Sequence, residues 1–395
     1  MSGIYFILFL YITLNFLILF RVSRYLKFPR WIMGSFISLF IVVALGYLIA
    51  RILKGYIPQA YLDMISLAGS FWIVAFVYFF LFWLAFEAGH LLLLFTGKLE
   101  STKSKLPKAF PAMAVVSIVI FVVMVITAGY FNNRQIVIRE MSIDIDKAVS
   151  ENQNLRVVMV TDIHLGYIVD GKRAEQIIKV INDQKPDIVF LTGDIIDIDT
   201  KTVVANGGAA ALDKIEAPLG VFACLGNREE YAGEDASFEL LDSVGINVLR
   251  DEFINLANGL QIAGRLDVSR ERFGKSRKPL KNIIGVADKN MPIILLDHQP
   301  KALKEAQDAG VDLILCGHTH NGQFWPFNYV VKMIFDVAYG YAKWGDMNIY
   351  VSNGVGTWGP PVRIGLPPEI VVINIHFTGK VLTGDKGLPL QSSGQ

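Results

Sequence analysis

The clearest indication of the fold is LRVVMVTDIHLGYIVDGKRAEQIIKVINDQKPDIVFLTGDIID, residues 155–197. Two runs rich in β-branched residues, 156–160 and 187–192, flank an amphipathic segment over 171–184. A short apolar run, a helix-length segment and a second apolar run are typical of a strand–helix–strand unit with parallel strands. We therefore expect an α/β domain, which we place at residues 152–378.

The rest of this domain continues the same alternation of short apolar runs and amphipathic segments. Helices are expected over 236–244 and 300–309. Further strands are expected over residues 221–225, 261–263, 293–296, 313–316, 349–351 and 370–375.

Five polar motifs follow predicted strands. They are TDIHLG at 161–166, GDIID at 193–197, GNRE at 226–229, the single His298, and GHTHNGQ at 317–323. In open α/β sheets, ligands bind beyond the carboxyl ends of the strands. The five motifs are therefore expected to meet in one site.

The side chains in these motifs are metal-ligand types. Four of the six histidines lie there, and Asp162, Asp194 and Asn227 add oxygen donors. Mixed imidazole and carboxylate ligands suit zinc, manganese, iron or nickel. Seven ligands are too many for one tetrahedral ion but suit two ions that share a carboxylate. The candidate ligands are Asp162, His164, Asp194, Asn227, His298, His318 and His320.

Spacing adds to this interpretation. Asp162 and His164 are two residues apart, as are His318 and His320. If each pair continues an extended strand, both side chains point to the same face. A lone D-x-H or G-D-x-x-D motif is more often structural, so the prediction of a metal centre depends on the ordered set.

The ordered motifs resemble those of the calcineurin-like metallophosphoesterases over about residues 152–377. That family's pattern is D-x-H, G-D-x-x-D, G-N-H-E/D, a lone H, and G-H-x-H. The segment SNGVGTWGPPVRIG, 352–365, is similar to the membrane-associated bacterial branch. The resemblance implies a four-layer αββα sandwich of two sheets flanked by helices. It also implies hydrolysis of a phosphoester or phosphoanhydride by a metal-bridging hydroxide.

The resemblance also implies a division of the ligands between two divalent ions. Asp162, His164 and His320 would bind one ion, and Asn227, His298 and His318 the other. Asp194 would bridge them. Asp197 would orient one of the ligands as a hydrogen-bond acceptor.

One residue departs from the family pattern: Arg228 stands where the family has a histidine. Arginine cannot give up a proton at working pH, although it can hold a phosphate by two parallel hydrogen bonds. Metal binding is expected to survive, while acid catalysis is reduced. A pseudoenzyme that binds or senses a phosphate ligand is the alternative, and an engineered inactivating substitution is another explanation for Arg228.

A loop rich in glycine and proline offers two candidate substrate-binding residues, Trp358 and Arg363. An aromatic ring and a cation on a stiff loop could form a wall of the site. The alternative for Trp358 is simple packing on the sheet.

The first 131 residues are far more apolar than the rest. Apolar segments at 4–20, 31–50, 67–95 and 110–130 each approach or exceed the ~20 residues that cross a bilayer. We predict a four-helix transmembrane region, although any one segment could be a buried core helix. The first segment lacks the basic start of a cleavable signal peptide. Residues 132–151 are expected to be a linker and 379–395 a flexible tail.

Basic residues concentrate in the first and third connectors between these segments. Positive residues favour the cytoplasmic side of a membrane. We therefore predict a protein of the bacterial inner or plasma membrane, with both termini and the large domain outside the cytoplasm. Such an anchor suggests a phosphorylated lipid or other amphiphilic substrate. Glu87 and His90 share a helical face, either satisfied within the helices or forming a lipid-headgroup or proton site. The latter would favour a transporter-like protein.

Net charge and cysteine content argue against a nucleic-acid-binding protein and against a disulfide-rich protein. The net charge is +1, so nothing suggests a nucleic-acid partner. Two cysteines, Cys224 and Cys316, cannot form a disulfide framework. Each ends an apolar run and is expected to be a small buried side chain.

Overall fold

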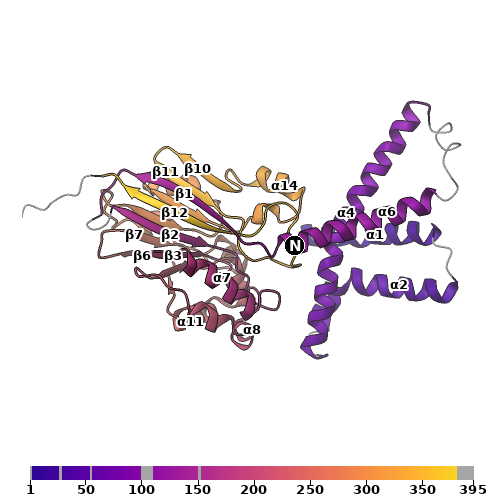
Figure 1. Cartoon of the computed structure of the whole chain (residues 1–395), viewed down its shortest axis with the longest axis horizontal. Coiled ribbons are helices and arrows are strands. Elements are labelled where there is room, and N and C mark those ends of the chain that lie inside the picture. The colour runs from indigo at the N-terminus through magenta and orange to yellow at the C-terminus, as the bar shows by residue number, and fades with distance from the viewer. Residues whose placement is uncertain (1, 26–28, 54–55, 99–109, 150–152, 380–395) are drawn as a thin grey trace, which may run out of the picture. The chain divides into compact units, whose positions relative to one another are not determined.

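The computed structural model describes residues 2–25, 29–53, 56–98, 110–149 and 153–379 (Figure 1). The chain divides into two compact units. The helical unit comprises Met1–Gln135 and Gly359–Gly365, and the sheet unit comprises Ile136–Trp358 and Leu366–Gln395.

The helical unit consists of α1 (Ser2–Tyr25), α2 (Arg30–Ala44), α3 (Gly46–Ile52), α4 (Gln59–Phe95) and α6 (Phe110–Asn132). Two stretches, Tyr61–Phe95 and Met113–Asn132, are long and apolar enough to cross a membrane. Leu8–Phe20 and Arg30–Ala44 are apolar but shorter. Of the four predicted spans, two therefore meet the length requirement in the described part of the chain.

The segment predicted as a single span over 31–50 is interrupted. Helix α2 ends at Ala44, the next residue, Leu45, has φ and ψ of −101° and 4°, and α3 starts at Gly46. A Cβ at Gly46 would lie 2.7 Å from the Ile65 carbonyl oxygen of α4. The glycine thus allows α3 to approach the α4 backbone, and the chain bends here rather than forming one straight span.

The sheet unit contains two six-stranded mixed sheets. The first has the order β1-β12-β2-β3-β4-β5 and the second β10-β11-β9-β8-β7-β6. The strands of the first sheet are β1 (Val137–Ile145), β12 (Glu369–Phe377), β2 (Asn154–Val160), β3 (Ile188–Thr192), β4 (Val221–Cys224) and β5 (Asn247–Val248). Those of the second are β10 (Gly340–Trp344), β11 (Met347–Val351), β9 (Leu313–Cys316), β8 (Ile293–Leu296), β7 (Gln261–Gly264) and β6 (Glu252–Asn255).

Three apolar cores set the layer order. One core lies between the sheets and includes Phe190 of β3 and Leu296 of β8. A second covers the other face of the first sheet and includes Ile177 of α7 (Gly171–Asp183). A third covers the other face of the second sheet and includes Ala306 of α13 (Leu303–Ala309). The unit is therefore a helix–sheet–sheet–helix sandwich.

The remaining helices are short. They are α8 (Thr200–Ala205), α9 (Gly208–Leu212), α10 (Asn227–Ala232), α11 (Glu234–Ser243), α12 (Leu280–Ile283), α14 (Phe327–Ile334) and the 3₁₀ turns η1 (Val268–Phe273) and η2 (His320–Gly322).

Two sequence predictions need correction here. Residues 137–145, expected to be part of a linker, form β1, which pairs in parallel with β12. This edge strand carries polar side chains at several positions, which hide its pattern. The helix predicted over 300–309 begins only at Leu303. The predicted tail lies outside the described residues from 380 onward. Cys224 and Cys316 are free and buried.

Candidate metal centre

Loops that follow strand ends carry all seven candidate ligands. Asp162 and His164 follow β2, Asp194 follows β3, and Asn227 begins α10 after β4. From the second sheet, His298 follows β8, and His318 and His320 follow β9. Both sheets thus contribute to a single site at the carboxyl ends of their strands.

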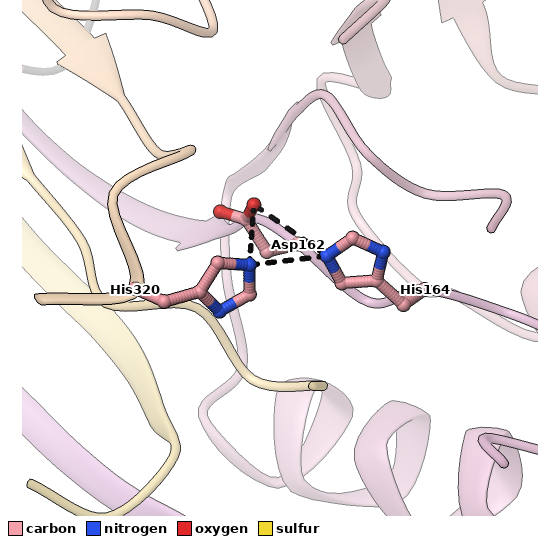
Figure 2. A group of neighbouring side chains, drawn as sticks. All are labelled: Asp162, His164 and His320. Atoms are coloured by element: carbon pink, nitrogen blue, oxygen red, sulfur yellow. Dashed lines mark hydrogen bonds and ion pairs between the residues drawn. The ribbon is translucent and has the colours of Figure 1, made fainter. Parts of the chain in front are cut away.

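Asp162, His164 and His320 form the first cluster, with ligand atoms within 4.8 Å of one another. Figure 2 shows the three side chains pointing toward a common point. The two histidine Nε2 atoms are 3.1 Å apart, and the His320 Nε2 is 3.2 Å from the Asp162 Oδ1. All three residues are buried. A buried carboxylate and two imidazole nitrogens converging in this way could hold a divalent ion.

Asp194, His298 and His318 form the second cluster, with the same 4.8 Å limit between ligand atoms. The His298 Nε2 is 3.3 Å from the Asp194 Oδ1. The other Asp194 oxygen, Oδ2, is 3.9 Å from the His164 Nε2 of the first cluster. Asp194 therefore directs one oxygen toward each cluster, as a bridging ligand must.

The backbone of these loops differs from the sequence expectation. Asp162, His164, His318 and His320 have φ values of 53°, 56°, 71° and 47°. These left-handed conformations are uncommon outside glycine and cluster at functional sites. Neither pair therefore continues an extended strand, although the side chains of Asp162, His164 and His320 still converge.

Several ligand atoms of the two clusters lack a well-oriented hydrogen bond, as atoms that bind an ion would. Among the residues that the structure describes, Asp162 Oδ1, Asn227 Oδ1 and His298 Nε2 are buried and make no well-oriented hydrogen bond. Buried polar atoms without a partner are rare, and each needs an explanation such as an ion. A carboxylate oxygen, an amide oxygen and an imidazole nitrogen are all suitable donors, so the site fits divalent metal.

Hydrogen bonds to the far nitrogens fix the imidazole rings. The His298 Nδ1 lies 2.7 Å from the Thr192 carbonyl oxygen, and the His164 Nδ1 lies 3.2 Å from the Asp197 Oδ1. An acceptor at Nδ1 leaves Nε2 free for a metal and raises the basicity of the ring. Burial acts to lower the pKa of His164, but Asp197 and the neighbouring carboxylates outweigh it and raise that pKa.

The Arg228 side chain approaches Asp197, the residue that also faces His164. The Arg228 backbone N–H donates to the Asp194 Oδ1 over 2.7 Å. Its Nη1 is 3.4 Å from the Asp197 Oδ1, the oxygen that also faces His164. The Arg228 side chain is 28% exposed, so it is only partly covered by the protein.

Glu229 is a site residue to which the sequence assigned no role. It is fully buried, and its carboxylate accepts hydrogen bonds from the backbone N–H groups of Asp194, Ile196 and Gly226. It therefore ties the loop after β3 to the loop after β4. Its position in the GNRE motif could have indicated that Glu229 belongs to the site. Its backbone partners become visible only in the folded structure.

The SNGVG segment, residues 352–356, forms hydrogen bonds with the loop that carries Asp162 and His164. Val355 N–H donates to the Thr161 carbonyl and Gly356 N–H to the Asp162 carbonyl. A Cβ at Gly356 would lie 2.0 Å from the Ile163 carbonyl oxygen, so only glycine allows this approach.

Trp358 and Arg363 have different surroundings. Trp358 is 46% exposed, and its carbonyl accepts from Gln323, three residues after His320. Arg363 is fully buried and belongs to the helical unit, and its backbone N–H donates to the Gly129 carbonyl. The structure does not group the Arg363 side chain with the clusters, and substrate binding by either residue stays a prediction.

Comparison with known proteins gives concordant matches. The profile of the calcineurin-like phosphoesterase family matches residues 155–322. An uncharacterised metallophosphoesterase of Aquifex aeolicus is 34% identical over 61% of this chain and 92% of its own length. One of Campylobacter jejuni is 28% identical over 90% of this chain and 92% of its own length.

A similar protein of Bos taurus is called a transmembrane protein with metallophosphoesterase domain. It is 28% identical over 73% of this chain and 66% of its own length. The Campylobacter alignment covers 357 residues, so it extends into the N-terminal helices as well as the sheet unit.

Proposed function

This chain belongs to the calcineurin-like metallophosphoesterases, and on that premise we propose that it hydrolyses a phosphoester or phosphoanhydride with two divalent ions. The observation that carries the proposal is the pair of adjoining clusters, with Asp194 presenting one oxygen to each. Manganese, zinc, iron or nickel would suit the ligands.

Each cluster would hold one ion. Asp162, His164 and His320 would bind the first, and Asn227, His298 and His318 the second, with Asp194 between them. When bound, the ions would supply Lewis-acid activation of water and stabilise charge on the transferred phosphoryl group. Asn227 contributes a neutral amide oxygen, which limits the negative charge facing a phosphate.

The chain's own residues would orient these ligands and the substrate. Asp197 and the Thr192 carbonyl hold the rings of His164 and His298. Arg228 presents a partly exposed guanidinium next to Asp197, where it could bind phosphate oxygens. Because it cannot release a proton, the leaving group would depart without acid assistance from this position.

We infer an amphiphilic substrate, with a phosphorylated lipid as the favoured class. The two helices long enough to cross a membrane support a membrane anchor. Such an anchor would hold the site near the bilayer surface, where phosphorylated lipids lie. In the proposed arrangement, further apolar helices complete a multi-pass region and the sheet unit lies outside the cytoplasm.

A second function is favoured by Arg228 itself. If turnover needs the missing acid, the domain would bind or sense a phosphate ligand without hydrolysing it. Arginine stabilises phosphate in the ground state and the transition state alike, which tightens binding without raising kcat.

Hydrolysis of bis(p-nitrophenyl) phosphate by the purified, metal-loaded full chain separates these functions. The enzyme proposal expects metal-dependent turnover that chelation abolishes. Saturable phosphate binding with no turnover under any of the four metals would contradict it and support the binding module. Phosphate release from lipid extracts, with and without metal, then tests the substrate class. Release from soluble phosphoesters alone would overturn the lipid proposal.

A further inference from the structure

Helix α14 and the residue pair before it expose an unusual amount of apolar surface. None of the eight residues of Phe327–Ile334 is buried. We define the α14 face as Trp325, Phe327, Tyr329, Val330, Met333 and Ile334, all of which are exposed. Met333 is 87% exposed and Ile334 64%. Lys332 is the only charged residue of the helix. A contiguous apolar surface of this kind usually marks an interaction site.

Both ends of α14 are attached to the loop that carries His318 and His320. At its start, the backbone of Phe327 and Asn328 lies against Gly322, where a Cβ would be 2.5 Å from the Asn328 nitrogen. At its end, the Phe335 ring packs edge-on against His318, with centroids 6.1 Å apart. Whatever covers the α14 face is therefore held next to the candidate metal centre.

The segment that follows α14 contacts the strand beside the point where the chain enters the sheet unit. Tyr339, shortly after α14, donates its hydroxyl hydrogen bond to Glu369 over 2.8 Å. Glu369 pairs with Val137, the first residue of β1. Val137 follows the last residue of α6, Asn132, by five residues, which span at most about 18 Å when extended. Covalent connection thus keeps this edge within reach of the membrane surface that α6 would leave.

We propose that the α14 face inserts into the interfacial layer of the bilayer and holds the metal centre at the level of lipid headgroups. The inference rests on the membrane anchor proposed above. A tryptophan and a tyrosine beside Met, Ile, Val and Phe match the composition of interfacial segments. Lys332 adds attraction to anionic headgroups.

A second copy of the chain fits this face less well. A stable protein interface buries about 1,200–2,000 Å² in total. An eight-residue helix is only about 12 Å long, so its face supplies a small part of that area. Lipid, in contrast, needs no matching surface beyond a few apolar side chains at the correct depth.

Spin labelling of the full chain in lipid nanodiscs tests the proposal. The label is attached to Met333→Cys and, as a matched control, to Val286→Cys in the same unit. Val286 is also aliphatic and 86% exposed. Cys224 and Cys316 are buried, and the parent protein carried through the same labelling corrects for any reaction there. Because both chosen side chains are exposed, neither substitution is expected to unfold the domain.

The readout is collision of each label with oxygen, which concentrates in lipid, and with a water-soluble nickel chelate. The proposal expects an oxygen-to-nickel ratio at Met333→Cys at least several-fold above that at Val286→Cys. Equal ratios would overturn it. Spin–spin broadening at Met333→Cys that disappears on dilution with unlabelled chain would also overturn it, in favour of a second copy. Since no turnover is measured, a failure of the proposed hydrolysis would leave this result unaffected.

Discussion

Asp197→Asn tests whether the carboxylate behind His164 contributes to metal binding. The Asp197 Oδ1 lies 3.2 Å from the His164 Nδ1 and 3.4 Å from the Arg228 Nη1. Asparagine keeps an acceptor at this position but removes the negative charge that makes the ring a stronger ligand. Loss of such an orienting partner costs about 10–100-fold in metal affinity.

We expect the lower end of that range, about 10-fold or ~1.4 kcal/mol. One reason is the acceptor that asparagine retains. The other is that Asp197 raises the pKa of His164, so its neutralisation lowers that pKa and reduces competition from protons. The Asp197 charge therefore makes His164 a stronger metal ligand but also favours its protonation, and these two effects on the apparent metal affinity oppose each other.

The assay is competition between the apoprotein and a chromophoric chelator, which resolves two binding steps. One step is expected to weaken by about 10-fold and the other to change little. Asp199→Asn is the matched control, because it makes the same charge change two residues away. Asp199 caps α8 by accepting from Thr202 N–H, and asparagine caps equally well. Unchanged binding constants in Asp197→Asn, or equal weakening in Asp199→Asn, would show that the Asp197 charge does not strengthen His164 as a ligand.

Three further predictions concern other parts of the chain. Arg228→His should raise kcat for alkyl phosphoesters far more than for nitrophenyl ones, within the ~10²–10⁴-fold range of positioned acids. If the native enzyme is as fast as Arg228→His on the alkyl ester, arginine is a specialised part of this site. Glu229→Gln should lower the free energy of unfolding by about 1–3 kcal/mol in denaturant titrations, because its amide N–H₂ faces backbone donors, whereas the exposed Glu239→Gln should change it little; equal effects would refute the tie between loops. A cysteine at Ser392 should react with a membrane-impermeant thiol reagent in intact cells, and reaction only after lysis would reverse the proposed orientation.

Much of the sheet unit was predictable because its central strands are continuous apolar runs. Residues 293–296 and 313–316 were predicted with the bounds that β8 and β9 have in the structure. Polar residues directly after such runs identified the loops of the metal centre. β1 could not be recognised in the same way, since an edge strand buries few of its side chains.

The conformations within the site were beyond the reach of sequence periodicity. The left-handed backbone at Asp162 and His164 is held by contacts from distant segments, including the hydrogen bonds of Val355 and Gly356 to the Thr161 and Asp162 carbonyls. The partners of Glu229 are backbone groups on other loops, and a backbone N–H leaves no mark on the sequence. The hydrogen bond from the Arg363 backbone N–H to the Gly129 carbonyl of α6 likewise joins segments far apart in the sequence.

The two-metal hydrolase proposal is tested by titrating the metal-free protein with one divalent metal while both metal content and phosphodiester hydrolysis are measured. We expect two ions per chain, with hydrolysis rising as the second site fills. Asp194→Asn should weaken both sites together, because each Asp194 oxygen faces one cluster. Retention of two ions at native affinity in Asp194→Asn, or full hydrolysis without metal, would contradict it.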